Sequence, residues 1–181
     1  MRLIGLLQLT HKAGGATMRS PWSALAFGVV VALGVVLGAD IVSLSAQASD
    51  PRIGAWKLNV AKSKFSPGPA PRSNTMKVEG SGQGEKVTTE GVNAEGGPTA
   101  TQYTANFDGK DSPITGTQNV DTVSLKRIDA RTTERTNKKD GKVTVILTSV
   151  VSQDGKTMTV TVKGTNAQGQ TVNNVVVWEK Q

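Results

Sequence analysis

Strict alternation of apolar residues and threonine near the C-terminus is the clearest pattern in the chain. Residues 157–162 read Thr-Met-Thr-Val-Thr-Val, so Met158, Val160 and Val162 fall on one face and threonine on the other. A period of two is typical of a β-strand with one buried face. The segment therefore predicts a half-buried strand.

Weaker alternation extends over much of the chain after residue 50. In 142–151, Val143, Val145 and Leu147 share one face, while the opposite face mixes threonine with Ile146 and Val150. Further strands are expected at 54–59, 74–79, 85–92, 99–107, 122–128, 132–137 and 171–178, with a weak strand at 112–115 that Pro113 confines to an edge or a strand start. We expect about eight to ten strands in all.

Two irregularities interrupt these patterns. Asn174 breaks the apolar face of 171–178, which predicts a bulge or a polar interior contact there. The apolar series Val123, Leu125, Ile128 slips by one position, which predicts a bulge near Arg127.

Turn signals separate the expected strands. Asp108-Gly109, Asp140-Gly141 and Asp154-Gly155 each stand between strand-like segments, and Asp-Gly favours the positive φ angles of a two-residue hairpin turn. Prolines 67, 69 and 71 forbid a regular helix across 61–73. The sequence therefore predicts an all-β, antiparallel up-and-down meander that closes into a barrel, with a sandwich as the alternative.

The N-terminal segment has a different pattern. Arg19 precedes an apolar run from Ala24 to Ala39, and Ala46-Gln47-Ala48 follows. This order is typical of a secretory signal peptide. We expect a signal helix in 1–48, cleavage between Ala48 and Ser49, a single domain over 49–181, and export to the periplasm or the extracellular space. An uncleaved anchor is the alternative, and either Met1 or Met18 can be the true start.

Composition excludes several classes of function. The chain has no cysteine and a single histidine, His11, which falls in the expected leader. Disulfides, zinc sites and Ser-His-Asp catalysis are therefore not expected, and we predict no metal, no cofactor and no catalytic residue. Residues 49–181 carry 18 basic and 13 acidic side chains, scattered rather than clustered with aromatics, so nucleic-acid binding is not expected.

The start and the end of the expected domain resemble the calycins, the superfamily of lipocalins and fatty-acid-binding proteins. The residues that carry the resemblance are Gly54-Ala55-Trp56-Lys57-Leu58-Asn59, then Ser63-Lys64-Phe65, and Asp154-Gly155-Lys156 with Val177-Trp178-Glu179-Lys180 at the end. The resemblance implies a lipocalin-like barrel with an interior, in which Gly54, Trp56 and Trp178 are structural. Val176 and Trp178 stand where fatty-acid-binding proteins have Arg-x-Tyr, so the carboxylate anchor of that family is missing.

Five residues are predicted to line the barrel interior as ligand-binding positions: Tyr103, Phe107, Leu125, Leu147 and Met158. The same residues can instead fill a dry core, and the sequence leaves both interpretations open. One arginine of the hairpin that carries Arg127, Arg131, Glu134 and Arg135 can point inward toward an anionic ligand, although solvated charge pairs explain the same residues.

These observations predict a monomeric, exported, non-enzymatic barrel that binds a small apolar or amphipathic molecule and has no membrane span after cleavage. The alternative is a dry structural or interaction domain that uses its threonine-rich face or its proline-rich segment.

Overall fold

The structure is a computed structural model that describes residues 50–166 and 168–181. These residues form ten strands and no helix: β1 (Gly54–Leu58), β2 (Ser73–Ser81), β3 (Gly84–Val92), β4 (Pro98–Asn106), β5 (Ser112–Thr115), β6 (Thr122–Arg127), β7 (Thr132–Lys139), β8 (Lys142–Val151), β9 (Thr157–Thr165) and β10 (Thr171–Lys180). The expected signal helix and the cleavage site between Ala48 and Ser49 lie outside the described residues. Within the described ranges, no helix has the length and hydropathy needed to cross a membrane.

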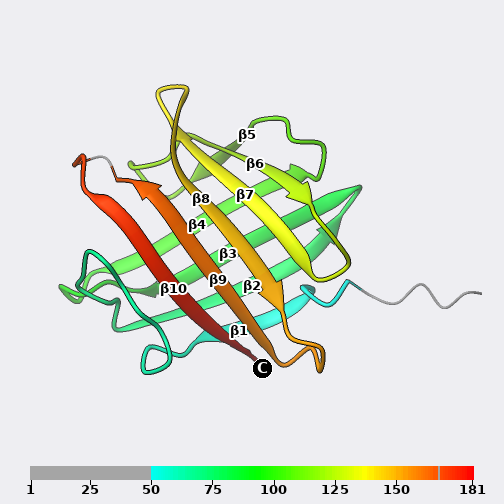
Figure 1. Ribbon diagram of the computed structural model, residues 1–181, viewed down its shortest axis with the longest axis horizontal. Helices are drawn as coiled ribbons and strands as arrows, with labels where there is room; N and C mark the ends of the chain where they lie inside the picture. The colour runs from blue at the N-terminus through cyan, green and yellow to red at the C-terminus, as the bar shows by residue number, and fades with distance from the viewer. Residues whose placement is uncertain (1–49, 167) are drawn as a thin grey trace, which may run out of the picture. The chain divides into compact units, whose positions relative to one another are not determined.

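Every strand pairs antiparallel with its neighbours in sequence, and the first strand pairs with the last. The β1–β10 pair joins Trp56 to Lys180 and Leu58 to Trp178, and it closes the sheet into a barrel. Figure 1 shows β7 to β10 crossing over β2 to β4, the two sides of this barrel. The predicted all-β, antiparallel up-and-down meander of about 8–10 strands closed into a barrel is therefore confirmed by the strand pairing.

The segment that follows β1 completes the barrel wall where β1 ends. The Lys64 N–H donates to the Val175 carbonyl at 2.7 Å, and the Val175 N–H donates back to Lys64 at 2.9 Å. The Asn174 side chain accepts a hydrogen bond from the Ser66 N–H at 2.7 Å, while the β9–β10 register runs without a shift. The expected bulge at Asn174 does not occur, and the polar contact that its side chain makes is exposed rather than in the barrel interior.

Along each strand, side chains alternate between the inside and the outside of the barrel, and the inward side chains form the core. The buried apolar residues come from inward positions of almost every strand and form one cluster: Trp56, Leu58, Val78, Val87, Tyr103, Ala105, Val123, Leu125, Val151, Met158, Val160 and Trp178. The predicted structural residue Trp56 is fully buried, and Trp178 is 8% exposed. Gly54 has φ +135°, a backbone conformation that residues with a side chain rarely adopt, so glycine at this position has a conformational reason.

A β-bulge is present, but it does not lie on the hairpin where the sequence predicts it. The β6–β7 register is regular through Arg127, and Ile128 lies exposed in the following turn, where strand parity no longer applies. The register shift occurs in β7–β8, where Asn137 pairs with Val145 but Lys138 pairs with Val143. The extra residue turns Val143 outward, with 56% of its surface exposed, so the prediction that Val143 shares a face with Val145 and Leu147 is wrong.

The Asp-Gly turns divide into two kinds. Asp140 and Gly141 have φ angles of 50° and 72° and form the two-residue turn that was predicted between β7 and β8. Between β8 and β9, only Gly155 has a positive φ, and the Ser152 N–H donates to the Thr157 carbonyl across a longer loop. The prediction of a two-residue turn at Asp154-Gly155 is therefore wrong.

Of the two expectations for β5, an edge position or Pro113 at the start of the strand, the structure bears out the second, because Pro113 is the second residue of the strand. The strand lies inside the barrel wall rather than at an edge, because it pairs with β4 on one side and β6 on the other. Each of these pairings spans only two residue pairs. Pro113 lacks an N–H donor, which is consistent with so short a ladder.

Candidate ligand-binding cavity

A cavity of about 310 Å³ lies inside the barrel. Strands β2 to β10 all contribute to its wall, and Arg52 enters it from the segment before β1. The lining residues are Arg52, Asn74, Met76, Glu85, Thr89, Thr101, Tyr103, Ile114, Thr117, Val120, Leu125, Thr133, Arg135, Asn137, Leu147, Ser149, Met158, Val160 and Trp178. The wall thus combines large apolar side chains with charged groups, amides and hydroxyls.

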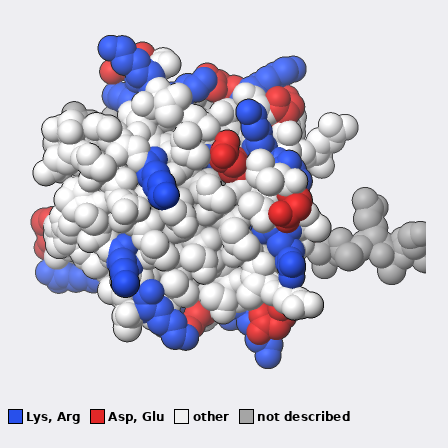
Figure 2. Space-filling model, in the orientation of Figure 1, with Lys and Arg blue, Asp and Glu red and all other residues white. Residues whose placement is uncertain are grey.

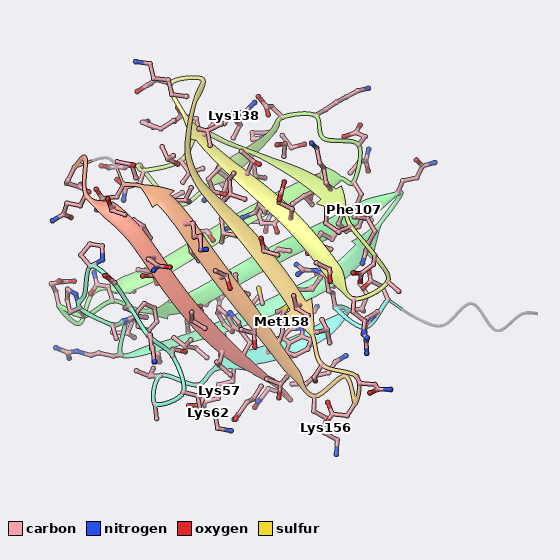
Figure 3. The ribbon with its side chains drawn as sticks, in the orientation of Figure 1. Lys57, Lys62, Phe107, Lys138, Lys156 and Met158 are labelled. Atoms are coloured by element: carbon pink, nitrogen blue, oxygen red, sulfur yellow. The ribbon has the colours of Figure 1, made fainter. Side chains whose placement is uncertain are left out.

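Four of the five residues predicted for the interior line this cavity. They are Tyr103, Leu125, Leu147 and Met158. Phe107 is not among the lining residues. It follows β4, and the Arg127 guanidinium lies 4.0 Å from the centroid of its ring. Figure 3 shows Met158 and Phe107 in different parts of the barrel.

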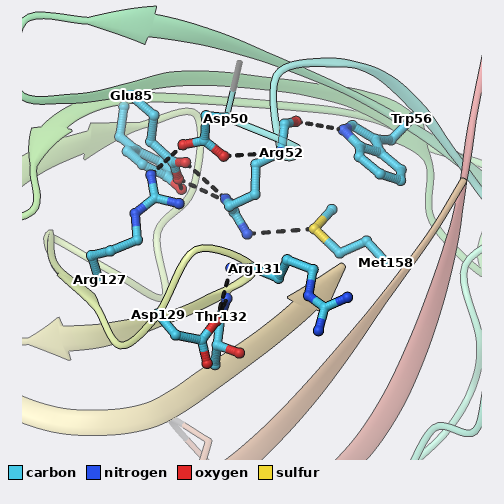
Figure 4. Close-up of polar contacts among 10 residues, drawn as sticks. Asp50, Arg52, Trp56, Glu85, Arg127, Asp129, Arg131, Thr132 and Met158 are labelled. Carbon is cyan, nitrogen blue, oxygen red and sulfur yellow. Dashed lines mark hydrogen bonds and ion pairs between the residues drawn. The ribbon is translucent and has the colours of Figure 1, made fainter. Parts of the chain in front are cut away.

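A buried ion pair crosses the interior beside this cavity. Arg52 Nε donates to Glu85 Oε2 and Arg52 Nη2 donates to Glu85 Oε1, both at 2.9 Å. The two residues are 4% and 1% exposed. A third contact joins Arg52 Nη1 to the Met158 sulfur at 3.4 Å. Figure 4 shows these contacts converging on the Arg52 side chain.

Trp56 and Tyr103 hold this pair from two sides. The Trp56 indole N–H donates to the Arg52 carbonyl at 2.8 Å, and the Tyr103 hydroxyl donates to Glu85 Oε1 at 2.9 Å. Trp56 is fully buried and is not among the residues that line this cavity. The bidentate pair and its neighbours form a rigid polar network in the core.

The pKa values of this network follow from burial and from the ion pair. Burial lowers the pKa of the Arg52 guanidinium, but the charge and hydrogen bonds of Glu85 outweigh burial, and that pKa lies above its usual value. Burial raises the pKa of the Tyr103 hydroxyl to about 12, against an opposing effect from the nearby Arg135 cation. Tyr103 is therefore neutral and a hydrogen-bond donor at physiological pH.

Arg135 is the second guanidinium in the cavity wall, and it differs from Arg52 in having no acidic partner among the described residues. Its guanidinium lies 5.3 Å from the centroid of the Tyr103 ring. Three buried polar atoms in the cavity wall have no hydrogen-bond partner in the described part of the chain: Arg135 Nε, Asn74 Oδ1 and Asn137 Oδ1. Unsatisfied buried polar atoms are uncommon in native proteins, so a single cavity wall with three of them is unusual.

The remaining charged residues of the Arg127–Arg135 hairpin lie outside the cavity. Arg127 forms an ion pair with Asp50, and Arg131 is exposed. Burial raises the pKa of the Asp50 carboxyl, but the hydrogen bonds from Arg127 and from the Arg52 backbone outweigh burial and hold that pKa below its usual value. Of the arginines considered from the sequence, the structure brings only Arg135 to the interior.

Arg52, Glu85, Asn74 and Asn137 were not predicted from the sequence. One signal was present: Glu85 shares the parity of Val87 and therefore the inward face of its strand. Asn137 likewise shares the parity of Thr133 and Arg135 on β7. Among the described residues, no group of three or more His, Cys, Asp or Glu side chains is arranged to hold a metal ion.

Comparison with known proteins supplies a likeness in structure but no match to a family model or a curated protein. The chain is similar in structure to the zebrafish ileal bile acid-binding protein, solved in complex with cholic acid. The sequences are 12% identical, the TM-score is 0.45, and the match covers 72% of this chain and 99% of the zebrafish chain.

Proposed function

We propose that this protein is a non-enzymatic barrel that binds a small amphipathic molecule in its interior. The observation that carries the proposal is the cavity, with Leu125, Leu147 and Met158 in the same wall as Arg135 and two unpartnered asparagine oxygens. Small-molecule sites are typically concave and largely apolar, with a few polar groups that fix the orientation of the ligand.

The size and chemistry of the cavity define the ligand further. A cavity of about 310 Å³ is at the lower end of the range for small-molecule sites, so the ligand is small. Its apolar part gains roughly 25 cal/mol for each Å² of surface removed from water against the leucines and Met158. Its polar part satisfies side chains that have no partner within the described chain.

A specific observation favours a second candidate function, an interaction domain. The outer face of β8 and β9 carries threonines together with Ile146 and Val150, which are 40% and 45% exposed. In Figure 2, few charged side chains interrupt the uncharged surface over these strands. An apolar, weakly charged face of this kind suits contact with a partner.

The decisive experiment is native mass spectrometry of the protein purified from its own host. A retained small molecule is expected for the wild type. Leu147→Trp fills the cavity and should abolish retention, whereas Ile146→Trp, one residue away on the outer face, should leave retention unchanged. Melting temperatures of both variants check that the barrel is folded, and Leu147→Phe is the milder substitute if Leu147→Trp does not fold. Equal retention in both tryptophan variants would contradict binding inside the barrel.

We also propose that the protein is exported after cleavage between Ala48 and Ser49. Arg19, the apolar run of residues 24–39 and Ala46-Gln47-Ala48 support this proposal. N-terminal sequencing of the protein recovered from the periplasm or the culture medium should begin at Ser49. An intact N-terminus in the membrane fraction would support the anchor instead.

A further inference from the structure

We infer that the ligand is an amphipathic monoanion, a small organic carboxylate whose head group binds Arg135. This inference rests on the proposed ligand-binding function and specifies the chemical class of its ligand. It is carried by the charge balance inside the cavity, by the way Arg135 is held, and by the residues that flank it.

The cavity wall contains three charged side chains: Arg52, Glu85 and Arg135. Arg52 and Glu85 neutralise one another through two hydrogen bonds of 2.9 Å. Arg135 has no ion pair with any described residue, so the described part of the wall carries a net charge of +1. Arg135 is half-buried, and its Nε is buried without a hydrogen-bond partner among the described residues, so an anion in the cavity would supply both the missing acceptor and the missing counter-charge.

The same charge balance distinguishes one class of anion from another. A monoanion brings the interior to neutrality, whereas a dianion such as a phosphate monoester leaves a net negative charge beside Glu85. A neutral ligand leaves Arg135 uncompensated. A guanidinium and a carboxylate also match in geometry, because the planar fork of donors faces two acceptor oxygens.

Arg135 is held in position by the buried network. Its guanidinium lies over the Tyr103 ring at 5.3 Å, within the range of a cation–π contact. Tyr103 is fixed in turn by its hydrogen bond to Glu85, and Glu85 by its two bonds to Arg52. The guanidinium is therefore oriented by the protein itself, which reduces the entropy lost when a ligand binds.

Apolar and amide side chains surround the guanidinium in the arrangement that an amphipathic acid requires. Leu125 on β6 and Leu147 on β8 are the direct cross-strand partners of Arg135, and both line the cavity. Asn137 lies two residues along β7, so its side chain lies on the same face as Arg135, and it is 6% exposed. An amide carries both a donor and an acceptor, which allows Asn137 to bind the head group or a hydroxyl of the ligand body.

The test compares three probes of equal chain length by isothermal titration calorimetry on delipidated protein: decanoate, decanol and decyl phosphate. We expect decanoate to bind at least about tenfold more tightly than decanol, a difference of roughly 1.4 kcal/mol. Decyl phosphate should bind no more tightly than decanoate. Arg135→Gln should remove the preference for decanoate and leave decanol binding unchanged, and Arg135→Lys should retain part of it. The matched control Arg131→Gln, on the same hairpin but exposed, should behave as the wild type.

The outcomes separate this inference from the function on which it rests. Equal binding of decanoate and decanol to the wild type, or a preference that survives in Arg135→Gln, would overturn the monoanion and leave the binding function standing. Tighter binding of decyl phosphate than of decanoate would also overturn it. If none of the three probes binds, and native mass spectrometry finds no retained molecule, the proposed function fails together with the inference.

Discussion

Arg52 and Glu85 form a bidentate ion pair in the interior of the barrel, although 33 positions separate them in the sequence. Arg52 precedes β1 and Glu85 lies near the start of β3, so the pair ties the N-terminal segment to the wall beyond β2. Removal of one partner leaves the other charged and buried, whereas an apolar replacement of both removes the cost of burying either.

Glu85→Gln should therefore destabilise the protein by about 3–5 kcal/mol, the cost of breaking a buried ion pair. The double variant Arg52→Met, Glu85→Leu should lose less than the sum of the two single variants. Urea unfolding at neutral pH measures both quantities. Lys77→Ala is a suitable control, because its ion pair with Glu79 is exposed and should contribute less than about 1 kcal/mol. A Glu85→Gln protein as stable as the wild type would show that this pair is not important for folding.

Trp56 is fully buried, so Trp56→Ala should cost about 3–5 kcal/mol through the cavity that it leaves. Trp56→Phe keeps much of the packing but removes the indole donor to the Arg52 carbonyl, and it should cost less than Trp56→Ala. Trp56 does not line the ligand cavity, so affinity for the probes should change little in folded Trp56→Phe. Lost affinity at unchanged melting temperature would instead make Trp56 a binding residue.

Two turn glycines should tolerate valine equally badly. Gly155 and Gly169 have φ angles of +70° and +77°, and no atom lies within 4 Å of an added Cβ at either position. The penalty is therefore backbone strain alone, on the order of 1–3 kcal/mol for each substitution to valine. From the sequence alone, the longer loop around Gly169 predicts a smaller loss of stability there than at Gly155. The positive φ angle of Gly169 does not support that expectation. Denaturant unfolding compares them, with Gly80→Val as the control, since Gly80 lies in β2 at a φ that is not positive.

The period of two was sufficient to predict most of the fold. Each strand needs only local alternation and a turn signal, and residues 157–162 show both without reference to the rest of the chain. The bulge in β7–β8 was not predictable in this way, because it is a property of the pairing between Asn137 and Val145 and not of either strand.

The candidate site was partly accessible from the sequence. Tyr103, Leu125, Leu147 and Met158 are large inward residues, and the structure places all four in the cavity wall. The polar half of the wall was not predicted, because Arg and Glu are ordinarily exposed and their pairing depends on contacts between distant segments. Glu85, on the parity of Val87, was the one local sign of a buried charge.

Tyr103 provides a test of the buried network through pH. Burial raises the pKa of its hydroxyl from 10.0 to about 12, because the tyrosinate would lose solvation and would lie beside the Glu85 carboxylate. A group whose pKa is higher in the folded state than in the unfolded state contributes stability that is present below the unfolded value. That stability is lost as pH rises from about 10 through about 12, since the unfolded chain releases its proton first.

The free energy of unfolding of the wild type should therefore fall over this alkaline range through Tyr103, and Tyr103→Phe should remove that part of the pH dependence. Tyr103 is the only tyrosine in the chain, so the ultraviolet absorbance of tyrosinate reports this residue alone. The folded protein should ionise near pH 12 and the urea-unfolded protein near pH 10. Phe107→Leu serves as the control, because it changes an aromatic residue outside the cavity and leaves the titrating group in place. Ionisation of Tyr103 at the same pH in both states would show that its hydroxyl is solvated, and the network of Tyr103, Glu85 and Arg135 would no longer account for the position of the Arg135 guanidinium.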